Sequence, residues 1–313
     1  MKKIVRPIVV ATMLLGLISQ QVYAIDTTAI NEKWGKPTVV YGGGLNDQQI
    51  KETSKLLGIK DENTVTTTKA TGEDLVKYLG AGEANTSVMI SSVMVQKRNK
   101  GEGVKVHIAT PKNITLVTSE QYANAAITAG VADAEIEVAA VSKVTGESAL
   151  TGVYKAFEAN GVVLDGKRTA VAQQELELTN QIAQEQSKEK GFDAAKLDQA
   201  MIDIKKSLAE IKEKQGQVAT KEDVERIVNE ALKKYGLDKV ISPTQVNNII
   251  QFALSYQQTS AIDSKQVLEQ LNSLSNTVKG KIGQLVDQAN REGWLDKIVA
   301  FFKEIFNAIF SSK

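Results

Sequence analysis

The chain has 313 residues, of which 38 are basic and 37 acidic, and it contains no cysteine. The lack of cysteine excludes disulfides, thiolate catalysis and cysteine-ligated metals, and we expect no lipid anchor of the lipoprotein type. The even charge balance argues against a nucleic-acid-binding protein, because such proteins usually carry a basic excess or a basic patch. Since His107 is the single histidine, we expect no zinc site and no cofactor.

Residues 1–24 have the pattern of a secretory signal peptide. Basic residues precede a short apolar run over 7–18, and Val22 and Ala24 then supply the small residues that a signal peptidase accepts before its cut. The apolar run is shorter than the ~20 residues that a membrane-spanning helix needs, which disfavours a membrane anchor. We therefore expect cleavage after Ala24 and a secreted or extracellular protein, either released or retained at the cell envelope.

A change of composition near residue 165 predicts two domains of different class. Glycine, threonine and valine dominate before it, whereas glutamine, glutamate, lysine, leucine and alanine dominate after it. We predict an N-terminal domain of the α+β or α/β class with a mixed sheet over 25–165. We predict an α-helical C-terminal domain over 166–313.

In the first domain, short β-favouring runs alternate with helices that begin at capping residues. The glycine run 42–44 predicts a tight turn rather than an anion-binding loop, because the lysine and hydroxyl of a phosphate loop are missing. The segment 99–102 has the composition of a hairpin turn. Predicted strands cover 38–41, 65–69, 87–97, 103–110, 114–117 and 134–141, and predicted helices cover 46–57, 71–79, 118–130 and 145–160.

Two stretches of this domain resemble each other. They predict a duplicated β-α-β-α unit with the hairpin 87–110 inserted between its halves. A chance match of caps and turns is the alternative explanation. The matching residues are Asn46, Gln49, Gly58 and Asp61 with Thr118, Gln121, Gly130 and Asp133, and Thr71-Gly72-Glu73 with Thr145-Gly146-Glu147.

The second domain shows helical signals throughout. Apolar residues from Leu197 to Ile211 recur at spacings of four and three, which predicts a helix packed in a bundle. Capping residues predict further helices over 220–235 and 242–257, the latter with Pro243 in its first turn. Another helix is predicted over 264–291.

The end of the chain, 294–310, predicts an amphipathic helix with an aromatic face. Charged residues off that face argue against a transmembrane helix. Two interpretations stay open: the helix docks on the bundle, or it contacts a membrane surface or a partner. The aromatic residues are Trp294, Phe301, Phe302, Phe306 and Phe310.

Catalytic residues are not identified by any strong motif. His107 lies alone on a predicted strand. Glu135 and Glu137 share one face of a strand, and Asp61 and Asp133 are related by the repeat. Paired carboxylates suit glycan hydrolysis, in which they act as acid and base or nucleophile. Among 37 acidic residues, however, some close pairs are expected by chance.

Short polar side chains near helix starts and turns are better candidates for a binding surface, although such residues also serve as ordinary helix caps. These candidate binding residues are Tyr122, Asn124, Thr128, Ser148 and Thr151.

The residues from Tyr122 to Val131, followed by Asp133 and Ala134, resemble the central motif of "domain of unknown function 1002", a family of exported Firmicute proteins. The segment 145–153, Gly44-Leu45 and the pair Ser91-Ser92 also match, and they add Ser91 and Ser92 to the candidate binding residues. The resemblance covers most of the mature chain and is strongest at 38–165. It implies a secreted or envelope-associated protein of a Gram-positive bacterium and transfers no catalytic role.

We therefore expect a non-enzymatic binding or structural role, with the cell wall, the membrane surface or an envelope protein as partner. One alternative is a cell-envelope hydrolase of glycans or peptides that uses carboxylates or hydroxyls of the first domain. Another is a secreted factor that acts on membrane surfaces. A hydrolase predicts a concave pocket with convergent ionisable groups, whereas a binding module predicts an exposed patch without them.

Overall fold

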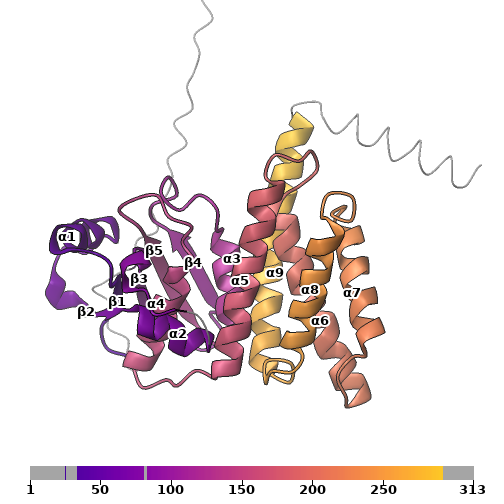
Figure 1. Cartoon of the computed structure of the whole chain (residues 1–313), viewed down its shortest axis with the longest axis horizontal. Coiled ribbons are helices and arrows are strands. Elements are labelled where there is room, and N and C mark those ends of the chain that lie inside the picture. Colours follow the sequence, from indigo (N-terminus) through magenta and orange to yellow (C-terminus); the bar gives the residue numbers. More distant parts are fainter. Residues whose placement is uncertain (1–24, 26–33, 81–82, 292–313) are drawn as a thin grey trace, which may run out of the picture.

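The computed structural model describes residues 25, 34–80 and 83–291, so the predictions for 1–24 and 294–310 lie outside the described residues. Within that part, the chain forms one mixed five-stranded sheet and nine α-helices, which confirms the predicted mixed α/β character. Figure 1 shows the sheet at one end of the molecule and the long helices at the other, with α5 between them.

The five strands lie in the order β2-β1-β3-β5-β4. β1 pairs parallel with β2, and β4 pairs parallel with β5, while β3 runs antiparallel to both β1 and β5. The central strand β3 is buried on both faces, which explains its continuous apolar run. The strands are β1 (Thr38–Gly42), β2 (Thr66–Ala70), β3 (Ser92–Lys97), β4 (Val104–Ile108) and β5 (Ala134–Ala139).

The predicted hairpin over 87–110 is wrong. Both of its strands form, but β5 lies between them. The connecting turn crosses the start of β5, where the Arg98 amide donates to the Asp133 carbonyl at 2.6 Å. The amides of Gly101 and Gly103 donate to the Asp133 carboxylate at 3.0 Å each. These bonds hold the turn on β5 and carry the chain to the far side of that strand.

The predicted duplication stays a prediction. The parallel pairs β1–β2 and β4–β5 are each followed by a helix, as a repeated unit requires. However, α1 (Asp47–Leu56) and α3 (Ser119–Ala129) pack into different apolar clusters, which lie on opposite faces of the sheet. The predicted strand 114–117 is reduced to one bridge between Ile114 and Val144.

Local capping chemistry sets several helix starts as predicted, whereas the helix predicted from residue 145 starts at Ser148 without a side-chain cap. Asn46, Thr71, Thr118 and Ser242 each accept a hydrogen bond from the amide three residues later and form complete capping boxes. α2 (Gly72–Leu79) and α4 (Ser148–Ala159) share the α3 face of the sheet. α1 lies on the other face, over β1 and its neighbours.

The C-terminal half is helical, as predicted. α5 packs on α2 and α3, α6 packs on α7 and α9, and α8 packs on α5 and α7. The apolar seam predicted from Leu197 lies on α6 and is buried up to Leu208. These helices are α5 (Gly166–Gln186), α6 (Ala194–Gln215), α7 (Lys221–Lys234), α8 (Pro243–Tyr256) and α9 (Lys265–Arg291).

One of the two apolar clusters joins the sheet to the helices of the C-terminal half. The cluster extends from Val40 in β1 to Val278 in α9, without a break at residue 165. The division into two domains at 165 stays a prediction, and the two parts share their packing. In the part of the chain that the structure describes, no helix has both the length and the apolar character needed to cross a membrane.

Candidate functional site

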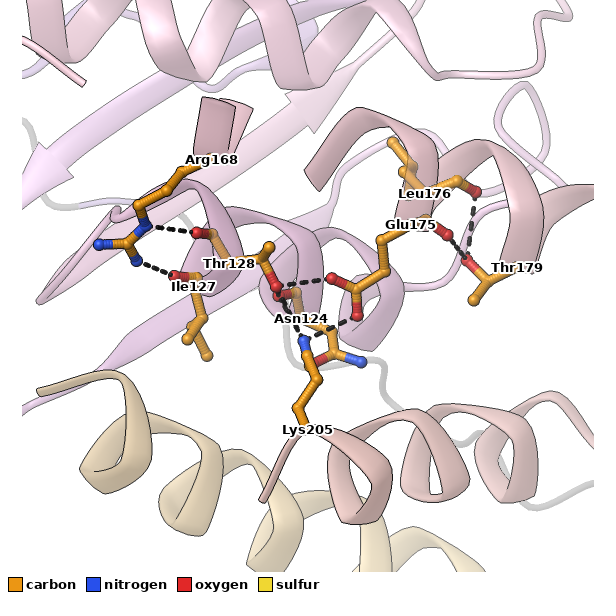
Figure 2. A network of polar contacts seen from close by, with 8 residues as sticks. All are labelled: Asn124, Ile127, Thr128, Arg168, Glu175, Leu176, Thr179 and Lys205. Atoms are coloured by element: carbon orange, nitrogen blue, oxygen red, sulfur yellow. Dashed lines mark hydrogen bonds and ion pairs between the residues drawn. The ribbon is translucent and has the colours of Figure 1, made fainter. Parts of the chain in front are cut away.

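Lys205 on α6 is a lysine whose side chain is 0% exposed. Lysine is almost never fully buried unless its charge is paired. Its partners come from two other helices: Glu175 from α5, and Asn124 and Thr128 from α3 (Figure 2). The site therefore lies at the junction of α3, which packs on the sheet, with α5 and α6 of the C-terminal half.

The ammonium group of Lys205 is fully hydrogen-bonded. Its Nζ donates to Glu175 Oε1 at 2.7 Å, to Asn124 Oδ1 at 2.6 Å and to Thr128 Oγ1 at 2.9 Å. The Thr128 hydroxyl in turn donates to Glu175 Oε2 at 2.6 Å, so both carboxylate oxygens accept a bond. Such saturation is what a buried ion pair requires to offset the cost of removing two charges from water.

Arg168 completes the junction between α5 and α3. Its Nε donates to the Thr128 carbonyl at 2.8 Å and its terminal nitrogen donates to the Ile127 carbonyl at 3.0 Å (Figure 2). These carbonyls belong to the last turn of α3, where a cation also interacts favourably with the helix dipole. The C-terminal end of α3 is thereby fixed to α5.

Burial lowers the pKa of Lys205 because it disfavours the ammonium form, and the Glu175 carboxylate opposes this shift. Burial and the Glu175 charge raise the pKa of Tyr154 well above its usual value. A lysine with a lowered pKa can serve as a base or nucleophile. Here, however, the side chain is sealed from solvent and its protons are all shared, so the arrangement holds three helices together rather than meeting a substrate.

Two of the predicted binding residues, Asn124 and Thr128, lie in this network. Sequence reasoning missed Lys205, Glu175 and Arg168. The available signal was the position of Lys205, four residues after Met201 and three before Leu208, on the apolar side of its helix.

The other predicted binding residues lie elsewhere. The Tyr122 hydroxyl donates to the Gly146 carbonyl at 2.6 Å, and the Ser92 hydroxyl accepts from the Gly42 amide at 3.0 Å. Ser91 and Thr151 are buried, and Ser148 is half-buried at the start of α4. The predicted role of these residues in ligand binding stays a prediction. Trp294, Phe301, Phe302, Phe306 and Phe310 lie outside the described residues.

The glycine run forms the expected tight turn. The amide of Gly43 donates to the Ala70 carbonyl at 2.8 Å, and the amide of Gly44 donates to the Met89 carbonyl at 3.0 Å. Because these donors are occupied within the fold, the loop has lost the free amides with which an anion site begins.

The candidate acid pairs are engaged in structural contacts. Glu135 pairs with Arg98. Asp61 caps the short turn that follows it, and Asp133 binds the turn before β4. Oε1 of Glu137 lies 3.4 Å from Nδ1 of His107. Among the described residues, no group of three or more metal-ligating side chains occurs.

Asp198 is a second buried ionisable residue on α6. It accepts a hydrogen bond from the Thr118 hydroxyl at 3.1 Å, and its other oxygen has no hydrogen-bond partner. Burial, reinforced by the nearby Glu120, raises the pKa of Asp198 well above its usual value. The folded protein thus holds this proton more tightly than the unfolded chain. The contribution of Asp198 to the free energy of unfolding is therefore most favourable below the pKa that this carboxyl has in the unfolded chain. It decreases as the pH rises toward the pKa of the carboxyl in the folded protein.

We expect Asp198→Asn to raise the free energy of unfolding at pH 7 by about 1 kcal/mol or more. At pH 4 the substitution should change this free energy little. Asparagine reproduces the shape of the protonated acid and can still accept from Thr118. Urea unfolding at both pH values measures the effect, with the exposed Asp238→Asn as control. An equal loss of stability at both pH values would show that the carboxylate is charged and compensated.

Comparison with known proteins places this architecture in a family. The family model described as "Protein of unknown function (DUF1002)" matches residues 41–274, which extend from β1 into α9. The "Uncharacterized protein YpuA" of Bacillus subtilis (strain 168) is 30% identical over 283 residues, covering 88% of this chain and 89% of the relative. No solved structure matches the chain. The family resemblance seen in the sequence is confirmed, and the chain belongs to the DUF1002 family.

Proposed function

We propose that this chain is an exported protein with a non-enzymatic binding or structural role at the cell envelope. The pattern of residues 1–24 and the absence of cysteine support export. The observation that carries the non-enzymatic role is the Lys205 network. The charged groups in it are buried and mutually saturated, whereas a catalytic site needs perturbed groups that a substrate can reach.

A cleft lined by charged residues, polar residues and glycines is the binding face that we propose. It has a volume of about 460 Å³ and lies between the turn after β3 and the first part of α9. Lys100 and Lys265 contribute positive charge, and Glu269 contributes an acceptor. Asp133 also lines the cleft, and its Oδ1 accepts hydrogen bonds from the backbone amides of Gly101 and Gly103. This mixture suits a polar, partly anionic wall polymer.

We expect residues 25–313 to co-sediment with purified Bacillus subtilis cell walls and to release no soluble fragments. Reversing Lys100 and Lys265 to glutamate should weaken binding about tenfold, at roughly 0.5–1 kcal/mol for each exposed charge contact. Reversing the exposed Lys188 and Lys190, in the loop after α5, is the matched control.

Released fragments would instead favour the hydrolase alternative and direct attention to the carboxylates of the N-terminal part. Absence from the pellet, without fragments, would count against both wall functions. In that case liposome binding by the chain with and without 294–313 tests the membrane-surface alternative.

A further inference from the structure

Glu137 in β5 is a buried carboxylate, and its side chain is 3% exposed. Among the described residues, no lysine or arginine lies within ion-pair distance of it, since Arg98 pairs with Glu135 instead. The described polar groups beside it are His107, opposite it on β4, and the backbone nitrogen of Ile25, which donates to Oε2 at 3.3 Å.

Ile25 is anchored at this point by its side chain as well. The residue is 5% exposed and belongs to the apolar cluster on the α1 face of the sheet, together with Tyr41 and Met94. Glu137 lies at the edge of this cluster, next to Ala139 on the same face of β5. Both the side chain and the nitrogen of Ile25 are therefore bound by the folded sheet.

A sequence prediction and a structural observation meet at one peptide bond. The sequence pattern predicts a signal peptidase cut between Ala24 and Ile25. The structure buries the residue that follows this bond and directs its nitrogen to the Glu137 carboxylate. Hydrolysis of the bond consumes one water, leaves a carboxylate on Ala24 and gives Ile25 an amino group that takes up a proton.

We propose that Glu137 is the internal binding site for the new N-terminus, so that processing converts a hydrogen bond from an uncharged amide into a buried ion pair between the Ile25 α-ammonium group and Glu137. The proposal rests on the export stated above. An ammonium donor adds the attraction between two opposite charges, which is stronger in a buried site than in water. Burial raises the pKa of Glu137 when its partner is only an amide, and an adjacent cation favours the ionised form.

The first test compares a chain that begins at Ile25, released from a fusion without extra residues, with one that carries one added glycine before Ile25. The added residue displaces the ammonium group from Glu137. We expect the equilibrium constant for unfolding in urea to rise about tenfold or more in the extended chain, because breaking a buried pair strands its carboxylate. In the Glu137→Gln background the two chains should be equally stable, whereas Glu135→Gln should preserve the difference.

The second test needs no substitution in the sheet. The amino group of Ile25 is acetylated with a water-soluble reagent at pH 8, and the rate of this acetylation is followed by mass spectrometry. A buried ion pair should slow this reaction about tenfold or more relative to the extended chain, because acetylation requires the uncharged amine. A rate equal to that of the extended chain, or equal stability of the two chains, would overturn the proposal.

Failure of export and failure of the ion pair give different results. N-terminal sequencing of the protein secreted from Bacillus subtilis reports the cut directly. A different mature N-terminus would contradict the processing step and with it the proposal. An N-terminus at Ile25 whose amino group is freely reactive would contradict the ion pair and leave export standing.

Discussion

Replacing Lys205 by methionine should lower the free energy of unfolding by about 3–5 kcal/mol, the cost of leaving one member of a buried ion pair without its partner. Methionine keeps most of the length of the lysine side chain, so the change removes the charge with little loss of volume. Glu175 would retain only the bond from Thr128. The side-chain oxygen of Asn124 would lose the hydrogen bond that it accepts from Lys205.

A double-mutant cycle separates the ion pair from the packing. Glu175→Leu in the Lys205→Met background should recover part of the loss, because a buried pair can be replaced by apolar residues at little cost. The recovery should be incomplete, since Asn124 and Thr128 keep polar atoms that then lack a partner. Urea unfolding measures each corner of the cycle. The neighbouring half-buried Lys206→Met should stay within about 0.5 kcal/mol of the parent.

The number of unfolding transitions provides a second test of the network. Because the network joins α3 to α5 and α6, and the core continues across residue 165, we expect the parent to unfold in one transition. Calorimetry of Lys205→Met tests whether the two halves then separate into two transitions. If Lys205→Met lowered the free energy of unfolding by less than about 1 kcal/mol, Glu175 would have to reach water or another donor. The network would then not be the link between the two halves.

Helix starts were predictable because their chemistry is local. A hydroxyl and an amide three residues apart, as in Thr118 and Gln121, satisfy each other wherever the chain lies. Pro243 marks a helix start for the same reason. The family motif around Tyr122 could also be read directly, since its residues form one nearly continuous segment that extends from α3 to the start of β5.

Strand order was not predictable, because it depends on contacts across long separations. The segment 99–102 has the composition of a hairpin turn, but bonds from this turn to Asp133 and Ala134 hold it across β5. Lys205 and Glu175 are similarly distant in sequence and belong to abundant residue types. Asn124 is a predicted binding residue because its side chain can form hydrogen bonds. The sequence did not reveal that a buried lysine uses that capacity.

The glycine run allows a test of close backbone packing that is independent of charge. We expect Gly42→Ala to lower the free energy of unfolding by about 2–3 kcal/mol, at the upper end of the cost of overpacking a core. A Cβ atom at Gly42 would lie 2.2 Å from the carbonyl oxygen of Met89. That atom belongs to backbone whose own position is fixed by a bond from Gly44, so it cannot move aside cheaply.

Gly280→Ala is the matched control, because nothing lies within 4 Å of a Cβ at that exposed helical position. It should raise stability by about 0.5–1 kcal/mol through the better helix propensity of alanine. Both variants are measured by urea unfolding, with and without phosphate. If Gly42→Ala kept the stability of the parent, segment 86–90 would have to separate from β1 without cost. If phosphate stabilised the parent but not this variant, the run would be an anion site. The occupied amides of Gly43 and Gly44 lead us to expect neither result.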